Sequence, residues 1–245
     1  AEITAKSNSP KLRASSGVAS NGPYTGQEIV VEGIYDVEIV PLIRLRSWTG
    51  DVEVVRHGGP TLNTSMLEAD MLIHPRDAIF TGLDSTAVLE SYDERYIFGK
   101  PENGNPRLFQ VTIEELTDVT VENVARPWNE DIVRTRLWLA AGRVSADINH
   151  STADRSNFAV KTPTVICGVN GTIFSMGYFP AFGPHEEVSF VNLTQGGPVT
   201  IEPVNPGFHS LELGNPGDSV RVGPTSGVTG GYRQVTTPVI PGYSV

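Results

Sequence analysis

The chain has 245 residues, of which 39% are hydrophobic and 19% are charged, so it can bury a sizeable core without staples. Its 28 acidic residues outnumber its 18 lysines and arginines, and the net charge of -10 argues against nucleic acid as a partner. No stretch approaches the roughly 20 apolar residues of a membrane helix, so we expect no membrane span. The single cysteine, Cys167, excludes an intrachain disulfide and any multi-cysteine metal cluster.

The two ends of the sequence differ in composition from the rest. Residues 1–26 are rich in Ser, Asn, Ala and Gly, and residues 215–245 are rich in Gly, Pro, Ser and Thr. Neither segment has enough apolar periodicity to fold alone, so we expect two extended arms around a β domain at 27–214. The opening Ala1 to Ala5 suits the terminus left by a signal peptidase, which predicts an extracytoplasmic protein, secreted, at the cell surface or in the periplasm.

Short β-branched runs between glycines and prolines are typical of strands. They predict an all-β fold, either an antiparallel β-sandwich or a β-solenoid-like body. The segment 130–141 fits a helix or a strand, and Gly142 after it favours the strand. The expected strands lie at 28–32, 37–40, 50–55, 77–81, 86–90, 109–113, 119–122 and, as the central strands of the domain, within 157–178.

The segment 156–174, SNFAVKTPTVICGVNGTIF, resembles the signature of FecR-like domains, an F-x-V-x-T-P strand followed by V-x-G-T-x-F. The resemblance covers 48–176, extends more weakly to 214, and leaves an insertion near 90–134. One departure is Asn170, where the family usually has an arginine, so no role of that arginine carries over. The residues of this structural signature are Gly82, Thr162, Pro163, Gly168, Gly171, Thr172 and Phe174.

The resemblance implies a module that receives a contact from an envelope receptor. The resemblance also implies a longer domain order for the regulators of this family, in which a cytoplasmic anti-sigma segment and a membrane helix precede the β domain. This sequence shows neither segment, so we expect a stand-alone exported FecR-domain protein.

No pattern in the sequence predicts a catalytic residue, a cofactor site or a metal site, and we expect the protein not to be an enzyme. The phosphate-binding glycine motifs and the Gly-x-Ser-x-Gly motif are absent. Adjacent carboxylates in a strand point to opposite faces, so acidic pairs are expected to be solvated surface. The residues weighed were His57, His74, His150, His185 with Glu186 and Glu187, His209, Asp93 with Glu94, Glu114 with Glu115, and Glu130 with Asp131.

Three further features of the sequence have ordinary structural explanations. Cys167 lies in an apolar run, so we expect a desolvated core thiol of low reactivity. The run 215–218, Asn-Pro-Gly-Asp, predicts a turn, with calcium binding as an open alternative. Glycosylation sequons occur at Asn63, Asn149, Asn170 and Asn192, of which Asn170 is expected in the core.

Three classes of function follow. The first is a non-enzymatic exported structural protein whose arms pair with copies of itself to make a filament or surface layer. The alternative is a FecR-type signalling or ligand-sensing module of the envelope. The weakest is an acidic hydrolase or carbohydrate-active β protein, in which Trp48, Trp128, Trp138 and any exposed tyrosines would stack on sugars.

Overall fold

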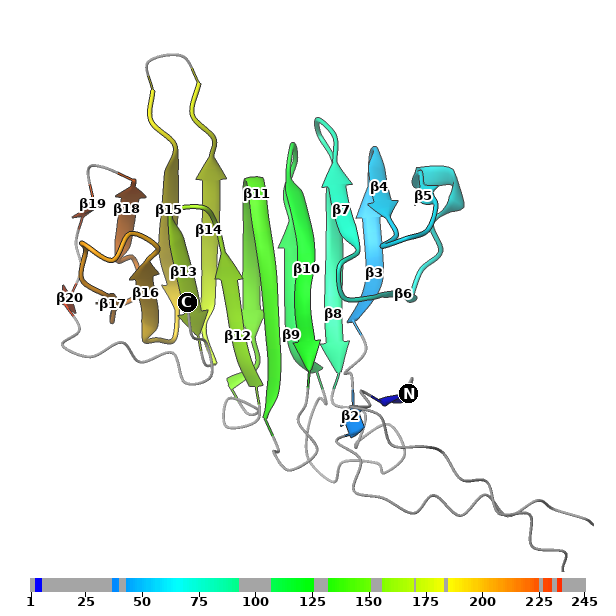
Figure 1. Ribbon diagram of the computed structural model, residues 1–245, viewed down its shortest axis with the longest axis horizontal. Coiled ribbons are helices and arrows are strands. Elements are labelled where there is room, and N and C mark those ends of the chain that lie inside the picture. The colour runs from blue at the N-terminus through cyan, green and yellow to red at the C-terminus, as the bar shows by residue number, and fades with distance from the viewer. Residues whose placement is uncertain are drawn as a thin grey trace, which may run out of the picture.

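The computed structural model describes residues 3–5, 37–39, 43–92, 107–125, 132–150, 156–169, 171–182, 185–224, 227–230 and 233–234. Most of them form strands, which build an elongated two-layer stack that grows in chain order from one end to the other (Figure 1). The predicted all-β fold is therefore confirmed. The stack is open at both ends, and its pairing is mixed, because β11 and β12 run parallel.

Each layer is a sheet of neighbouring strands. In order across the stack, the first layer contains β6 (Met71–Ile73), β3 (Ile43–Thr49), β8 (Thr86–Tyr92), β9 (Arg107–Ile113), β11 (Val133–Ile148), β14 (Ile173–Phe179), β15 (Val188–Gln195), β18 (Ser219–Gly223) and β19 (Gly227–Gly230). The second contains β5 (Thr61–Leu62), β4 (Val52–Val55), β7 (Ala78–Thr81), β10 (Asp118–Ala125), the first half of β11, β12 (Ser156–Lys161), β13 (Val165–Val169), β16 (Val199–Pro203), β17 (Leu211–Leu213) and β20 (Arg233–Gln234).

Three short elements lie outside these layers. β1 (Ile3–Ala5) and β2 (Val37–Ile39) pair antiparallel in a small separate sheet. A short 3-10 helix (Thr64–Met66) follows β5, and the side chain of Asn63 caps it by accepting a hydrogen bond from the Ser65 amide.

The long strand β11 links the two layers. Residues 133–141 pair with β12 and β10 in the second layer, and residues 142–148 pair with β9 and β14 in the first. The crossing falls at Gly142, whose φ of +87° is open to glycine and strained for other residues. The strand expected within 130–141 is thus present, and it is longer than predicted because it continues past the glycine.

Hydroxyl side chains stabilise the corners where the chain passes between the layers. The Asp51 amide donates to Ser85 Oγ at 2.8 Å, and the Arg143 amide donates to Thr117 Oγ1 at 2.9 Å. The Thr117 amide donates in turn to Thr81 Oγ1 at 3.0 Å. The hydroxyl at each corner therefore accepts a hydrogen bond from a backbone amide of the neighbouring corner, and these bonds link successive turns of the stack.

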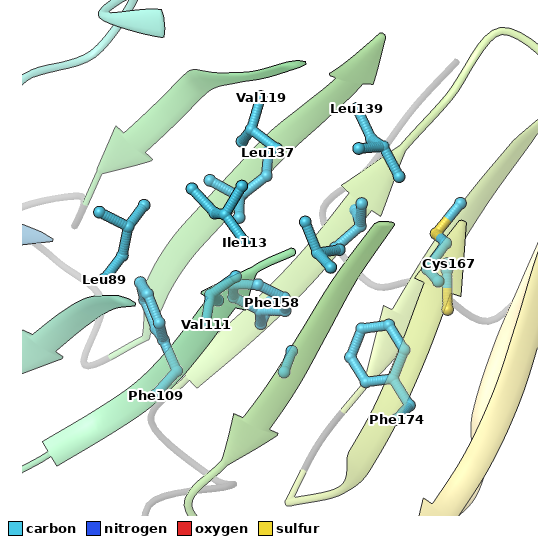
Figure 2. Packing of buried hydrophobic residues seen from close by; sticks show 14 of the residues in the cluster. Leu89, Phe109, Val111, Ile113, Val119, Leu137, Leu139, Phe158, Cys167 and Phe174 are labelled. Carbon is cyan, nitrogen blue, oxygen red and sulfur yellow. The ribbon is translucent and has the colours of Figure 1, made fainter. Parts of the chain in front are cut away.

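The core lies between the layers and extends from Ile43 of β3 to Val222 of β18. Figure 2 shows part of it from close by. Phe158 of β12 packs against Phe109 of β9 at 4.9 Å and against Phe174 of β14 at 6.4 Å between ring centroids. These rings join the second layer to the first at the middle of the molecule. Cys167 of β13 is fully buried in the same core.

The expected arms lie mostly outside the described residues, as does the strand expected at 28–32. The described part of the C-terminal arm differs from the expectation, because β18 pairs with β15 inside the first layer. Val220 and Val222 of β18 are buried in the core. Their alternation with exposed neighbours is that of a half-buried strand, so the segment after 214 adds a strand to the body.

Candidate functional site

The five histidines do not form a single cluster, and all five are exposed. His57 and His74 lie near each other, because their backbone amides both donate to the buried Asp77 carboxylate, each at 2.9 Å. The side chain of His57 lies beside that of Arg76, at 3.4 Å between their nitrogens. Among the described residues, no three side chains of His, Cys, Asp or Glu gather closely enough to hold a metal ion.

The acidic candidates are engaged in separate structural contacts. Glu114 accepts from Ser145 Oγ at 2.8 Å and pairs with Arg143 at 3.4 Å. Glu115 instead accepts from the Asp84 amide at 3.0 Å, so these two carboxylates serve different neighbours. The pairs at 93–94 and 130–131 lie outside the described residues.

The run 215–218 forms a turn whose polar groups are used internally. Asp218 Oδ2 accepts from the amides of Gly214 at 3.1 Å and Asn215 at 2.9 Å. Gly217 has a φ of +91°, which suits the predicted glycine position of a bend.

The three sequons in the described residues are Asn63, Asn149 and Asn192. Asn63 caps the 3-10 helix, and Asn149 donates to the Arg107 carbonyl at 2.8 Å. Asn192 is exposed on the outer face of the first layer. Asn170 lies outside the described residues.

Packing contacts account for the positions of the cysteine and of the two described tryptophans. Burial raises the pKa of the Cys167 thiol far above its usual range, so the reactive thiolate is suppressed. Trp48 is partly buried against the core, and Lys161 lies 5.5 Å above the ring of Trp138. Trp128 lies outside the described residues.

The Thr-Pro-Thr run of the signature forms a buried hydroxyl cluster. Thr162 Oγ1 and Thr164 Oγ1 are hydrogen-bonded to Ser189 Oγ at 2.7 Å and 2.6 Å. The Val165 amide donates to Thr162 Oγ1 at 3.1 Å, which fixes the turn between β12 and β13. Because Ser189 belongs to β15, this cluster ties a turn of the second layer to the first.

The glycines of the signature lie where backbone comes close. Gly171 has a φ of +65°, and a Cβ there would lie 2.6 Å from Nδ1 of His150. The Gly82 amide donates to the Asp51 carbonyl at 2.8 Å, and a Cβ there would lie 3.2 Å from the Asp51 Cβ. Gly168 pairs across the second layer in the interior of β13. Thr172 and Phe174 are buried.

A different part of the molecule exposes a concentration of aromatic side chains. The β14–β15 hairpin projects beyond the edge of the stack (Figure 1). Phe182 near its end is 83% exposed, and Phe179 and Phe190 at its base are 46% and 42% exposed. The rings of Phe179 and Phe190 pack edge to face, with centroids 5.7 Å apart. We call these three residues, with Arg143 and Arg221, the aromatic hairpin surface.

Strand alternation produces this surface. Phe174, Met176 and Tyr178 of β14 point into the core, so Phe179 at the end of the strand points outward. On β15 the exposed Phe190 lies between the buried Ser189 and Val191 in the same way. The outward face of two paired strands therefore brings the two rings together.

Backbone and side-chain contacts fix the hairpin. Phe182 and His185 exchange amide-to-carbonyl hydrogen bonds of 3.2 Å and 3.1 Å near its end. The Tyr178 hydroxyl donates to the Glu187 carboxylate across its base. Burial first, and then this carboxylate, raise the pKa of Tyr178 well above its usual range, so the phenol stays protonated and keeps the bond.

Two shallow depressions flank the ring of Phe179. One, of about 450 Å³, is lined by Arg143, Ser175, Gly177, Phe179, Phe190 and Asn192. The other, of about 360 Å³, is lined mainly by Glu114, Glu115, Leu116, Arg143, Tyr178 and Phe179. The surface thus offers apolar walls beside charged and amide groups, as in the centre and rim of protein interfaces.

Sequence reasoning did not identify this surface, because an apolar residue in a strand is normally assigned to the core. The run Phe179-Pro-Ala-Phe182 before a Gly-Pro pair carried the available signal. Phenylalanines beside turn residues lie where the chain leaves the sheet and has no core to enter.

The described residues define an open, two-layer, all-β protein with an exposed aromatic hairpin. No protein-family model and no curated protein sequence matches this chain. Among the described residues, no helix is long and apolar enough to cross a membrane.

Two solved structures are partly similar, and each is a candidate anti-sigma factor from Parabacteroides distasonis. The first has a TM-score of 0.35 and 16% identity, over 52% of this chain and 50% of that chain. The second has a TM-score of 0.30 and 15% identity, over 63% of this chain and 53% of that one. The similarity to this class of protein is weak and spans about half the length of each neighbour.

Proposed function

We propose that the chain is an extracytoplasmic, non-enzymatic binding module of the FecR type, which acts by contacting a protein of the cell envelope. The observation that carries this proposal is the aromatic hairpin surface. Three exposed phenylalanines on one hairpin, beside two arginines, form the composition enriched at protein interfaces. The FecR-type assignment rests on the signature, whose Thr162 and Phe174 take part in joining the two layers.

Site-specific photocrosslinking in the native host tests this proposal. A photoactivatable phenylalanine analogue is placed at Phe182, at Phe190 and, as the control, at Phe80, which is 37% exposed on the second layer. The proposal predicts a discrete adduct from the two hairpin positions and none from Phe80. Equal adducts at all three positions, or none from the hairpin, would contradict it.

Self-assembly through the arms is a second candidate. Among the described strands, the short β5 and β6 end one side of the stack and β19 and β20 end the other, so both ends of this described part present edges that a further strand can extend. Residues 1–26 contain three cations and one acid, a net charge of +2, and the rest of the chain therefore carries -12. A basic arm and an acidic body attract each other between copies.

Light scattering and negative-stain microscopy test the second candidate directly. The full chain is compared with a variant lacking residues 1–26 at equal concentration and ionic strength. Polymers of the full chain that disappear on truncation would support arm exchange. Monomers in both samples would refute it.

A further inference from the structure

We infer that the aromatic hairpin surface binds an extended protein segment in which an apolar side chain lies between two acidic residues, each two positions away. This inference rests on the proposed binding function and specifies its partner. It follows from one row of residues across four strands of the first layer.

The row is set by strand register. Arg143 of β11 is opposite Gly177 of β14, Gly177 is opposite Phe190 of β15, and Phe190 is opposite Arg221 of β18. Residues directly opposite each other point to the same face of a sheet. Two cations therefore flank a glycine gap and an aromatic ring on one exposed face.

The glycine provides the space between the charges. Gly177 has no side chain, and a Cβ there would lie 3.4 Å from the ring of Phe179. The depression above it is walled by Phe179 and Phe190, with Ser175 and Asn192 along one side. An apolar side chain of a partner can enter here, while the serine and the amide can bond its backbone.

The two arginines select the charge of the partner. Arg221 lies 5.7 Å from the ring of Phe190 and has no ion pair among the described residues. Arg143 is exposed and shares one carboxylate, Glu114, at 3.4 Å. In a chain with a net charge of -10, this is a local basic site that an acidic segment would recognise.

The separation of the arginines gives the spacing of the acids. Three strand steps of about 4.8 Å place their backbones about 14 Å apart. An extended chain covers about 13 Å in four residues, and its alternate side chains point to one face. A segment crossing the strands would therefore present acid, apolar residue and acid at positions i, i+2 and i+4.

Titration of the isotope-labelled full chain with blocked pentapeptides tests this inference by NMR. Asp-Thr-Phe-Thr-Asp is expected to shift the amides of Gly177, Phe190 and Asn192. Asn-Thr-Phe-Thr-Asn should bind about tenfold more weakly, since an exposed ion pair contributes a factor of up to about five. Thr-Asp-Phe-Asp-Thr, which has the same composition, should bind severalfold more weakly because its acids face away.

Two variants separate binding from folding. Arg221→Glu should weaken binding of the acidic peptide about tenfold or more, whereas Arg76→Glu, an equal change of charge at an exposed site on another part of the stack, should leave it unchanged. Dispersed spectra of both variants confirm that they fold.

Three results would overturn the inference. The first is equal binding of all three peptides, and the second is a set of chemical-shift changes confined to other residues. The third is a change at the same amides caused by an oligogalacturonate but not by the peptides, which would assign the surface to an anionic glycan. Crosslinking at Phe190 without any peptide preference would overturn this inference and leave the proposed function standing.

Discussion

Replacing Gly142 with alanine probes the crossing of β11 between the two layers. The residue has a φ of +87°, and a Cβ there would lie 2.3 Å from Thr117 Oγ1 and 2.6 Å from the Leu116 carbonyl oxygen. Thr117 is buried and holds the Arg143 amide, so it cannot move aside without losing that bond. The substitution should therefore strain the backbone and disrupt a buried corner.

The magnitude is the sum of two effects. Left-handed backbone costs an alanine about 1–2 kcal/mol, and forced repacking of a buried site costs about 1–3 kcal/mol. We expect Gly142→Ala to lower the free energy of unfolding by about 2–5 kcal/mol. At about 2–4 °C per kcal/mol for a chain of this size, Tm should fall by roughly 4–20 °C.

Gly217→Ala is the matched control. Gly217 has a similar φ of +91°, but a Cβ there would meet nothing within 4 Å, so only the backbone strain applies. Urea unfolding followed by circular dichroism should show a loss of about 1–2 kcal/mol for this variant and a clearly larger one for Gly142→Ala. Equal losses would refute the steric account of the crossing.

Further predictions concern three buried groups. Ser189→Ala should cost about 1–3 kcal/mol in urea unfolding, because two buried threonine hydroxyls lose their shared partner, while Thr194→Ala at an exposed site of the same strand should cost little. Asp77→Asn should also cost about 1–3 kcal/mol, because the buried carboxylate accepts a 2.6 Å bond from Arg56, and an unchanged urea midpoint would contradict this. Cys167 should resist a thiol reagent at pH 8 in the native protein and react once the chain unfolds, since burial raises its pKa; rapid labelling of the native state would contradict that placement.

The strand content and the burial of Cys167 could be predicted because local pattern determines them. Along β11 the buried positions are odd-numbered up to Leu139 and even-numbered from Val144 onward. This change of parity around Gly142 records the passage from one layer to the other. The sequence pattern therefore indicates the crossing. It does not indicate which strands pair on each side of it, because pairing depends on residues far apart in the chain.

The candidate site was harder to predict for a physical reason. Phe190 and the buried Phe174 have similar apolar neighbours along the chain, and only the direction in which each strand face points makes one exposed and the other buried. The row from Arg143 to Arg221 joins residues 78 positions apart through three strand pairings. No local sequence motif indicates such a row.

Crosslinking from position 190 in the native host, with and without the Arg221→Glu substitution, tests the central claim most directly. If the aromatic hairpin surface binds an acidic protein segment, the analogue at Phe190 should give a discrete adduct whose yield falls severalfold when Arg221 becomes glutamate. An adduct that is unchanged by this reversal of charge, or matched by one from Phe80, would contradict the claim.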